Sequence, residues 1–270
     1  MINKGRAGLT EQYATGPFLP WEDRTIVQSP PSTSTVEDVQ VNFNPNIDHY
    51  KNSWSKTNAA VIQDILDPFA ARTLHEYYFN QPDEWWDLAI FPDPYGNYEG
   101  GGYPLYRCKP GDPSIPDRIK HTLDLNDKGE FAYMYRRTEN YHPVLNVFSS
   151  PGFIKSLEYI SGYENLKFNW DMTFISNYGP GHFNGPHTDG MNGRIAFVYH
   201  LSKDWKPWNG GLFARMDWEW KNADALVVPG FNKMAIFNVF GDETGGAPHL
   251  VTEVAQGCTN KRISFTGWYQ

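Results

Sequence analysis

The spacing of hydrophobic and polar positions changes at about residue 165. Upstream, apolar residues recur at helical spacing in two stretches, and each stretch is opened by a capping residue followed by proline. Asp67-Pro68 predicts a helix that runs to about Asn80, and Ser150-Pro151 predicts a second helix that ends at Gly162. The residues expected to face inward are Phe69, Leu74 and Tyr77 or Tyr78 in the first helix, and Phe153, Leu157 and Ile160 in the second.

From about residue 165 the apolar period becomes two, which is typical of strands. Short strands separated by turn-forming clusters such as GPGHFNGP, KPWNGG and GDETGGAP indicate a β-sandwich or jelly roll. We therefore predict a mainly β fold with flanking helices. The strand candidates are the alternating stretch from Phe168 through Trp170, Met172, Phe174 and Ser176 to Tyr178, the segments 194–201, 224–229, 233–240, 249–254 and 262–269, and a short upstream strand at 59–66.

Two segments lack a clear period. Residues 1–56 include SPPSTST at 29–35, which cannot hold a helix or a central strand, so we expect an N-terminal arm that is extended or partly mobile. Residues 57–270 are expected to form a single domain with its β core at about 165–270. The Gly-, Pro- and Tyr-rich stretch 91–112 is long enough to be a functional lid or a disordered loop.

Composition and charge narrow the classes of function. Hydrophobic residues make up 40% and charged residues 20%, as in globular proteins. A net charge of −8 argues against nucleic acid as a main partner, and no apolar run is long enough to span a membrane. The first residues, MINKGRAGLTEQ, lack the apolar core of a secretory signal. The two cysteines, Cys108 and Cys258, form no metal-binding pair or disulfide framework, which is consistent with a reducing cytoplasm.

Candidate chemistry begins with His187-Thr188-Asp189. In a strand, residues two apart share a face, so an imidazole and a carboxylate could grip one cation. The alternative is a surface His and Asp in a Gly-rich turn. His249 opens a predicted strand after a Gly-rich loop and could supply a third ligand, whereas His182 is the alternative ligand if the register differs. Two His and one carboxylate form the facial triad of non-haem Fe(II) oxygenases, which leaves coordination positions open.

The last predicted strand carries a candidate anion site. Arg262 and Ser264 share one face, while Ile263 and Phe265 face the other way. An arginine that points into a barrel suits the far end of a dicarboxylate, because the guanidinium fork matches a carboxylate. The alternative is an edge arginine in a surface salt bridge.

Together, these residues and their order resemble a known family, the 2-oxoglutarate and Fe(II)-dependent dioxygenases in their prolyl 4-hydroxylase-like branch. The resemblance covers about 170–270 closely and continues more loosely upstream through AAVIQDILDPFAARTLHEYYFN and FAYMYRRT. Residues 1–55 match nothing in the family. The segments that carry the resemblance are NYGPGHFNGPHTDG, GRIAFVYHLSKDWKPWNGGLF, VPGFNKMAIFNVF, PHLVTEV and KRISFTGWY.

The resemblance implies a double-stranded β-helix, the cupin-like jelly roll, with Fe(II), 2-oxoglutarate and O2 as cofactor and co-substrates. By the same resemblance, Arg262 with Ser264 would hold the C5 carboxylate of 2-oxoglutarate, and Tyr178 would hydrogen-bond the co-substrate. Either Tyr199 or His200 would supply a further contact. The iron ligands implied are His187, Asp189 and His249. Radical halogenases replace the Asp with a small residue, so the presence of Asp189 favours hydroxylation.

The activity implied is hydroxylation of an unactivated C–H of proline, peptidyl proline or another amino-acid-like substrate, with release of succinate and CO2. The partner would be a small-molecule or peptidyl substrate. Desaturation, cyclisation or demethylation at the same iron site is an alternative, and a non-catalytic cupin-like binding module is another. Secondary candidates are Arg194, which faces the substrate or braces its loop, one of Arg136 and Arg137, the pair Asp242 and Glu243, and Trp205 and Trp208, which are expected to pack.

Overall fold

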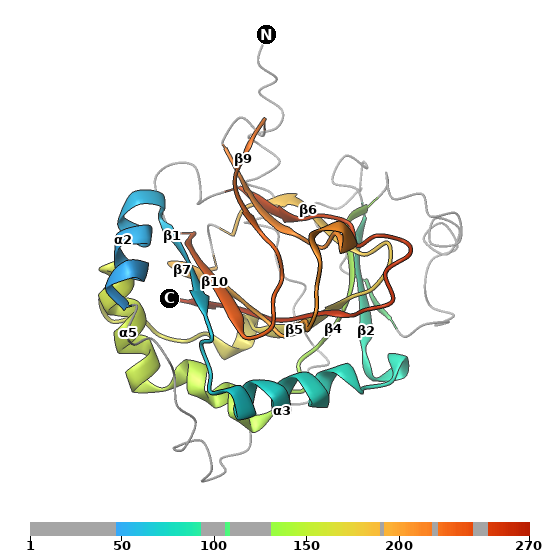
Figure 1. Ribbon diagram of the computed structural model, residues 1–270, viewed down its shortest axis with the longest axis horizontal. Coiled ribbons are helices and arrows are strands. Elements are labelled where there is room, and N and C mark those ends of the chain that lie inside the picture. The colour runs from blue at the N-terminus through green and yellow to red at the C-terminus, as the bar shows by residue number, and fades with distance from the viewer. Residues whose placement is uncertain (1–46, 93–105, 109–130, 190–191, 218–220, 240–247) are drawn as a thin grey trace, which may run out of the picture.

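A computed structural model describes residues 47–92, 106–108, 131–189, 192–217, 221–239 and 248–270. Its helices lie mostly upstream of its strands (Figure 1). The α-helices are α2 (Ile47–Thr57), α3 (Pro68–Phe79) and α5 (Pro151–Ser161). The strands are β1 (Ala59–Gln63), β2 (Asp87–Pro92), β3 (Tyr106–Cys108), β4 (Phe131–Thr138), β5 (Phe174–Tyr178), β6 (Phe183–His187), β7 (Ile195–His200), β8 (Phe213–Met216), β9 (Ala223–Val227), β10 (Lys233–Asn238), β11 (His249–Val251) and β12 (Arg262–Tyr269).

The strands form two antiparallel layers. One layer has the order β5-β12-β7-β10 and the other has the order β6-β11-β8-β9. From β5 onward the chain passes back and forth between the layers, which is the winding of a double-stranded β-helix. Strand β4 pairs with both β5 and β6 and joins the two layers. The predicted fold class, mainly β with flanking helices around a jelly-roll core, is confirmed.

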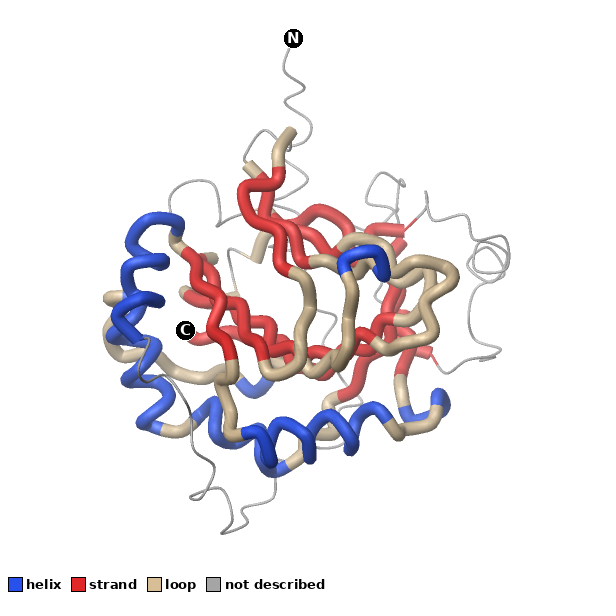
Figure 2. Tube along the Cα trace, viewed as in Figure 1, coloured by secondary structure: helices blue, strands red, loops and turns tan. Residues whose placement is uncertain are grey.

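The helices cover the outer face of the first layer (Figure 2). Strand β7 is buried along its whole length, because one of its faces packs on the helices while the other lines the barrel. Outward-facing side chains of the layer, including Phe197, Tyr199 and Phe265, form the main core with Leu74 of α3 and Leu157 of α5. This core anchors the strands whose opposite faces carry the candidate site.

Both predicted helices are present with their predicted caps. The Asp67 carboxylate accepts from the backbone N–H groups of Phe69 and Ala70, and Gly162 ends α5 in the left-handed region at φ 76°. Phe153, Leu157 and Ile160 are buried as expected. The prediction for Phe69 is wrong: it is 74% exposed, because it lies in the first turn of α3, whose buried stripe runs through Ala70, Leu74 and Tyr78.

The strand predictions hold best in the last hundred residues. Strands β7 and β12 lie within one residue of their predicted bounds. Strand β5 begins only at Phe174, since Trp170–Met172 forms a short 3-10 helix. Strand β6 was predicted as part of a turn cluster. Its sequence, FNGPH, offers a single large apolar residue, and only pairing with β11 and β4 makes it a strand.

The predicted N-terminal arm must be shortened. Residues 47–57 form α2, whose Tyr50 and Trp54 lie four positions apart and are both buried. Residues 1–46 lie outside the described residues, as do 93–105 and 109–112 of the predicted lid and the pair Asp242 and Glu243. Among the helices that the structure describes, none is long and apolar enough to cross a membrane.

Candidate metal centre and co-substrate pocket

Two histidines and one aspartate converge at the junction of β6 and β11. The antiparallel pairing of these strands places His249 directly opposite His187, and Asp189 follows two residues after β6 ends. One ligand atom from each residue lies within 4.8 Å of the others. The Asp189 Oδ1 is 3.7 Å from His187 Nε2, and its Oδ2 is 3.3 Å from His249 Nε2. The sequence expected His187 and Asp189 to share a strand face, whereas Asp189 reaches the cluster from beyond the strand.

The protonation states of this cluster suit a bound cation. Burial, reinforced by repulsion from His249, lowers the pKa of His187 to about 4, so the imidazole is neutral at pH 7. Its Nδ1 is 2.8 Å from the Gly185 carbonyl oxygen, which fixes the proton there and leaves Nε2 as the ligand atom. Burial alone would raise the pKa of Asp189, but attraction to His249 and His187 outweighs it and the pKa is lowered. A neutral imidazole and an ionised carboxylate are the forms that bind metal.

Aromatic side chains surround the cluster. The His249 ring centroid is 5.6 Å from that of Phe213 and 4.8 Å from that of Phe237. The indole N–H of Trp268 contributes to the lowered pKa of Asp189, although its geometry falls short of a hydrogen bond. His249 and Asp189 are accordingly buried, whereas the His187 side chain is 22% exposed.

Arg262 forms a second buried polar centre on the inner face of β12. It is 1% exposed, its Nε donates to the Gly211 carbonyl oxygen at 2.6 Å, and its Nη1 donates to Ser264 Oγ at 3.1 Å. Its Nη2 has no hydrogen-bond partner, and no carboxylate pairs with it among the described residues. A Cβ at Gly211 would lie 2.8 Å from Arg262 Cδ, so a glycine is needed for this approach. Burial lowers the pKa of Arg262 to about 10, which leaves it charged at pH 7 and in need of an anion.

Tyr199 and His200 point to opposite faces of β7. The Tyr199 hydroxyl donates to Asn232 Oδ1 at 3.0 Å on the outer face of β7, in the core beneath the helices. His200 points the other way, lies opposite Ser264 on β12, and is fully buried with neither ring nitrogen hydrogen-bonded. Burial and the nearby Arg262 keep its pKa well below the usual value. A neutral His200 can donate one hydrogen bond into this space.

Tyr178 belongs to a stack of rings that extends away from Arg262. The Arg262 Cζ lies 4.7 Å from the centroid of Tyr178, whose ring stacks on Tyr135 at 4.9 Å, and Tyr135 stacks on Phe174 at 5.9 Å. Arg137 covers the far end, with its Cζ 4.2 Å from the centroid of Phe174. Sequence reasoning missed Tyr135 and Phe174. Period-two alternation on β4 and β5 places both on the inner face, but nothing local shows that they stack.

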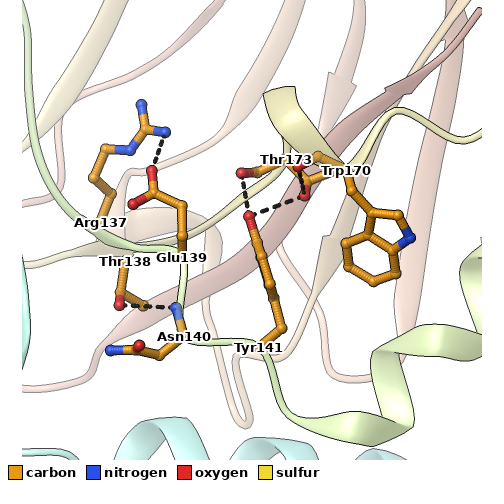
Figure 3. A network of polar contacts seen from close by, with 7 residues as sticks. All are labelled: Arg137, Thr138, Glu139, Asn140, Tyr141, Trp170 and Thr173. Atoms are coloured by element: carbon orange, nitrogen blue, oxygen red, sulfur yellow. Dashed lines mark hydrogen bonds and ion pairs between the residues drawn. The ribbon is translucent and has the colours of Figure 1, made fainter. Parts of the chain in front are cut away.

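The surroundings of this stack include two polar contacts (Figure 3). Arg137 Nη2 pairs with Glu139 Oε1 at 2.8 Å. The Tyr141 hydroxyl donates to the Thr173 carbonyl oxygen at 2.6 Å, just before β5 begins. The Tyr141–Thr173 contact holds the start of β5 against the segment that follows β4, whereas the Arg137–Glu139 pair is local to the end of β4.

The structure also gives the contacts and the exposure of the secondary candidates. His182 is outside the metal cluster and accepts from the Gly179 backbone N–H through Nδ1. Arg194 donates to the Glu164 carbonyl oxygen at 3.1 Å and so ties the start of β7 to the segment that follows α5. Arg136 points outward to Asp83 at 2.8 Å, so of the two adjacent arginines Arg137 is the inward one. Trp205 is buried as expected, whereas Trp208 is 76% exposed and the packing prediction for it is wrong.

A jelly-roll barrel with a two-His, one-carboxylate cluster and a buried arginine that has no carboxylate partner among the described residues has the features of a metal-dependent oxidoreductase of the double-stranded β-helix class. Residues 173–270 match the family model of the 2OG-Fe(II) oxygenase superfamily, and this segment holds every residue of both centres. This segment is therefore similar to the 2OG-Fe(II) oxygenases, enzymes that use Fe(II), 2-oxoglutarate and O2. The resemblance stated from the sequence is confirmed at this level.

Solved structures with a related shape have little sequence in common with the chain. A prolyl-4-hydroxylase from Pseudomonas putida is 15% identical with a TM-score of 0.42, over 84% of this chain and 99% of that one. A 2OG-Fe(II) oxygenase family oxidoreductase from Burkholderia pseudomallei is 13% identical with a TM-score of 0.49, over 86% and 92%. The epimerase SnoN from nogalamycin biosynthesis is 10% identical with a TM-score of 0.48, over 83% and 82%. No curated protein sequence matches the chain.

Proposed function

We propose that the protein hydroxylates an unactivated C–H of proline, peptidyl proline or another amino-acid-like substrate, with 2-oxoglutarate converted to succinate and CO2. One observation carries the proposal: the inner surface of one barrel holds both a three-residue cation site and a buried arginine that has no counter-ion among the residues the structure describes. The two centres lie at the two ends of β8, since Arg262 bonds Gly211 just before that strand and His249 pairs with Arg215 in it. Gly211 and Arg215 are four residue steps apart, which corresponds to roughly 13 Å along an extended strand.

Each residue has a distinct part in this proposal. His187, Asp189 and His249 would hold Fe(II) on one side, which leaves the other side open for the co-substrates. Arg262 Nη2, supported by Ser264, would bind the C5 carboxylate of 2-oxoglutarate. When bound, the iron and 2-oxoglutarate supply the oxidising chemistry, and the protein positions the reactants.

The polar groups around Arg262 could hold one end of a dicarboxylate. His200 would add a neutral N–H donor from the opposite strand. Ser264 Oγ also contacts Ser176 Oγ at 2.8 Å, which orients the hydroxyl groups. Tyr178 lies under the guanidinium and would donate its phenol hydrogen to the same ligand. Because these donors are held in place before binding, little reorganisation accompanies co-substrate binding.

The experiment that tests this proposal measures succinate release from 2-oxoglutarate by the purified protein with Fe(II) and O2. We expect release that requires the metal and is lost in His249→Ala. A screen of proline, prolyl peptides and free amino acids for products heavier by one oxygen then tests the substrate class. A protein that binds Fe(II) and 2-oxoglutarate but releases no succinate under any of these conditions would instead be a binding module.

The carboxylate at position 189 favours hydroxylation within the enzyme class. Asp189 is buried and ionised, and it contributes a ligand atom to the cluster. Desaturation, cyclisation or demethylation would use the same ligands, because the outcome depends on where the substrate carbon sits. A product two hydrogens lighter than the substrate would identify one of these alternatives.

A further inference from the structure

Arg215 is a buried arginine that neither centre uses. It lies on β8 directly opposite His249 of β11, and residues opposite each other on paired strands point to the same face. Phe213, two residues earlier on the same face, contacts the His249 ring and belongs to the apolar lining of the barrel. The Arg215 side chain therefore starts from the inner face of the barrel, beside a ligand of the metal cluster, and only 7% of its surface is exposed.

The contacts of Arg215 leave part of its guanidinium available. Its Nε donates to Asp224 Oδ1 at 2.8 Å, and its Nη1 donates to the Thr57 carbonyl oxygen at the end of α2. Its Nη2 makes no hydrogen bond to any residue that the structure describes, and it is not sealed from solvent. The Asp224 side chain is 46% exposed, so its carboxylate can turn into solvent when another carboxylate takes its place beside the buried Arg215.

We propose that Arg215 is a substrate-binding residue that takes a carboxylate of the substrate next to the metal cluster. The inference rests on the proposed function and adds to it a substrate class, namely molecules with a free carboxylate. The guanidinium offers Nη2 and, once Asp224 swings out, Nε as well, which together form the planar fork that binds a carboxylate through two parallel hydrogen bonds. The Thr57 carbonyl holds the third nitrogen and keeps the fork in place.

In this arrangement Asp224 occupies the carboxylate site when no substrate is bound. Substrate and Asp224 therefore compete for Arg215, which predicts opposite effects for the two residues. Removing the guanidinium should weaken binding of acids, whereas neutralising Asp224 should strengthen it. An arginine that only ties β8 to the end of α2 would make both changes harmful or neutral, and neither change would distinguish an acid from its amide.

The experiment compares paired probes on the protein loaded with Fe(II) and 2-oxoglutarate in the absence of O2. L-Proline and L-prolinamide form one pair, and the C-terminal acids and amides of short prolyl peptides form others. Calorimetry measures binding of each probe to the parent, Arg215→Gln, Arg215→Lys and Asp224→Asn. Arg136→Gln is the matched control, because it removes an Arg–Asp pair of the same 2.8 Å length on the outside of the barrel.

The parent should bind an acid at least about tenfold more tightly than its amide, as expected for a charge-assisted pair. Arg215→Gln should abolish that preference, Arg215→Lys should keep part of it, Asp224→Asn should enlarge it, and Arg136→Gln should leave it unchanged. If Arg215→Gln fails to fold, the inference is still tested by whether Asp224→Asn raises or lowers the preference for acid over amide.

Three results would overturn the inference: a parent with no acid preference in any pair, an Arg215→Gln variant that keeps the preference, or an Asp224→Asn variant whose acid binding is unchanged or weaker. Succinate release without any probe tests the proposed function separately. Succinate release together with one of these three results would refute the proposed carboxylate site and leave the proposed function unaffected.

Discussion

Removal of the Arg262 guanidinium should cost the enzyme its co-substrate and leave its metal in place. Arg262 is fully buried, makes two hydrogen bonds and has no counter-ion among the described residues, so the C5 carboxylate would be its partner. Truncating one partner of a buried charge pair costs about 2–5 kcal/mol. Arg262→Ala should therefore raise the dissociation constant for 2-oxoglutarate by roughly 30-fold or more, at tenfold per about 1.4 kcal/mol. Arg262→Lys should recover only part of this, because an ammonium lacks the planar fork.

The assay is thermal or chemical unfolding with and without 2-oxoglutarate. At a concentration 100 times its dissociation constant, the ligand stabilises the parent by about 2.7 kcal/mol. A 30-fold weaker affinity reduces the same gain to under about 1 kcal/mol. Fe(II) affinity measured without 2-oxoglutarate is the control and should barely change, since Arg262 is not among the cluster's ligands. The reasoning fails if Arg262→Ala binds 2-oxoglutarate like the parent while another basic residue such as Arg194 proves essential.

Three further predictions concern the metal cluster and His200. His187→Ala should abolish Fe(II) binding in a calorimetric titration, whereas His182→Ala should leave it largely intact; equal loss in both would mean that the ligand is misassigned. Asp189→Gly should abolish hydroxylation and yield little chlorinated product with chloride present, as read by mass spectrometry; full hydroxylase activity would show that Asp189 is not a ligand. Burial keeps the pKa of His200 well below that of a free histidine. Below about pH 6.5 this side chain is therefore protonated in the unfolded chain but not in the folded one, and the free energy of unfolding should fall as the pH drops. His200→Gln should remove up to about 1.4 kcal/mol of that fall at one pH unit below 6.5, as measured by urea unfolding at pH 5.5 and 7.5; an unchanged slope would contradict the buried neutral state.

Much of the architecture could be predicted from local sequence. The caps at Asp67 and Ser150 act through atoms two or three residues away, so the starts of α3 and α5 could be read directly. Strands β7 and β12 were equally clear, because several apolar residues recur on each of them. By contrast, β6 has few apolar residues and is a strand only because β11 and β4 supply its hydrogen bonds. The exposure of Phe69 likewise depends on which face of α3 the barrel covers.

Some features of the candidate site could likewise be predicted from the sequence, and others depend on the tertiary structure. Ligand types, their order and the alternation of Arg262 with Ser264 are properties of the sequence, and they pointed to iron and a dicarboxylate before any fold was known. Only the tertiary structure decided that His200, and not Tyr199, faces Arg262, because the inner face of β7 is set by the helices that bury Tyr199 on the other side. Arg215 shows the same limit most plainly. Nothing near it in the sequence marks it, and it lies beside His249 because β8 and β11, which β9 and β10 separate in the chain, pair side by side in one layer of the barrel.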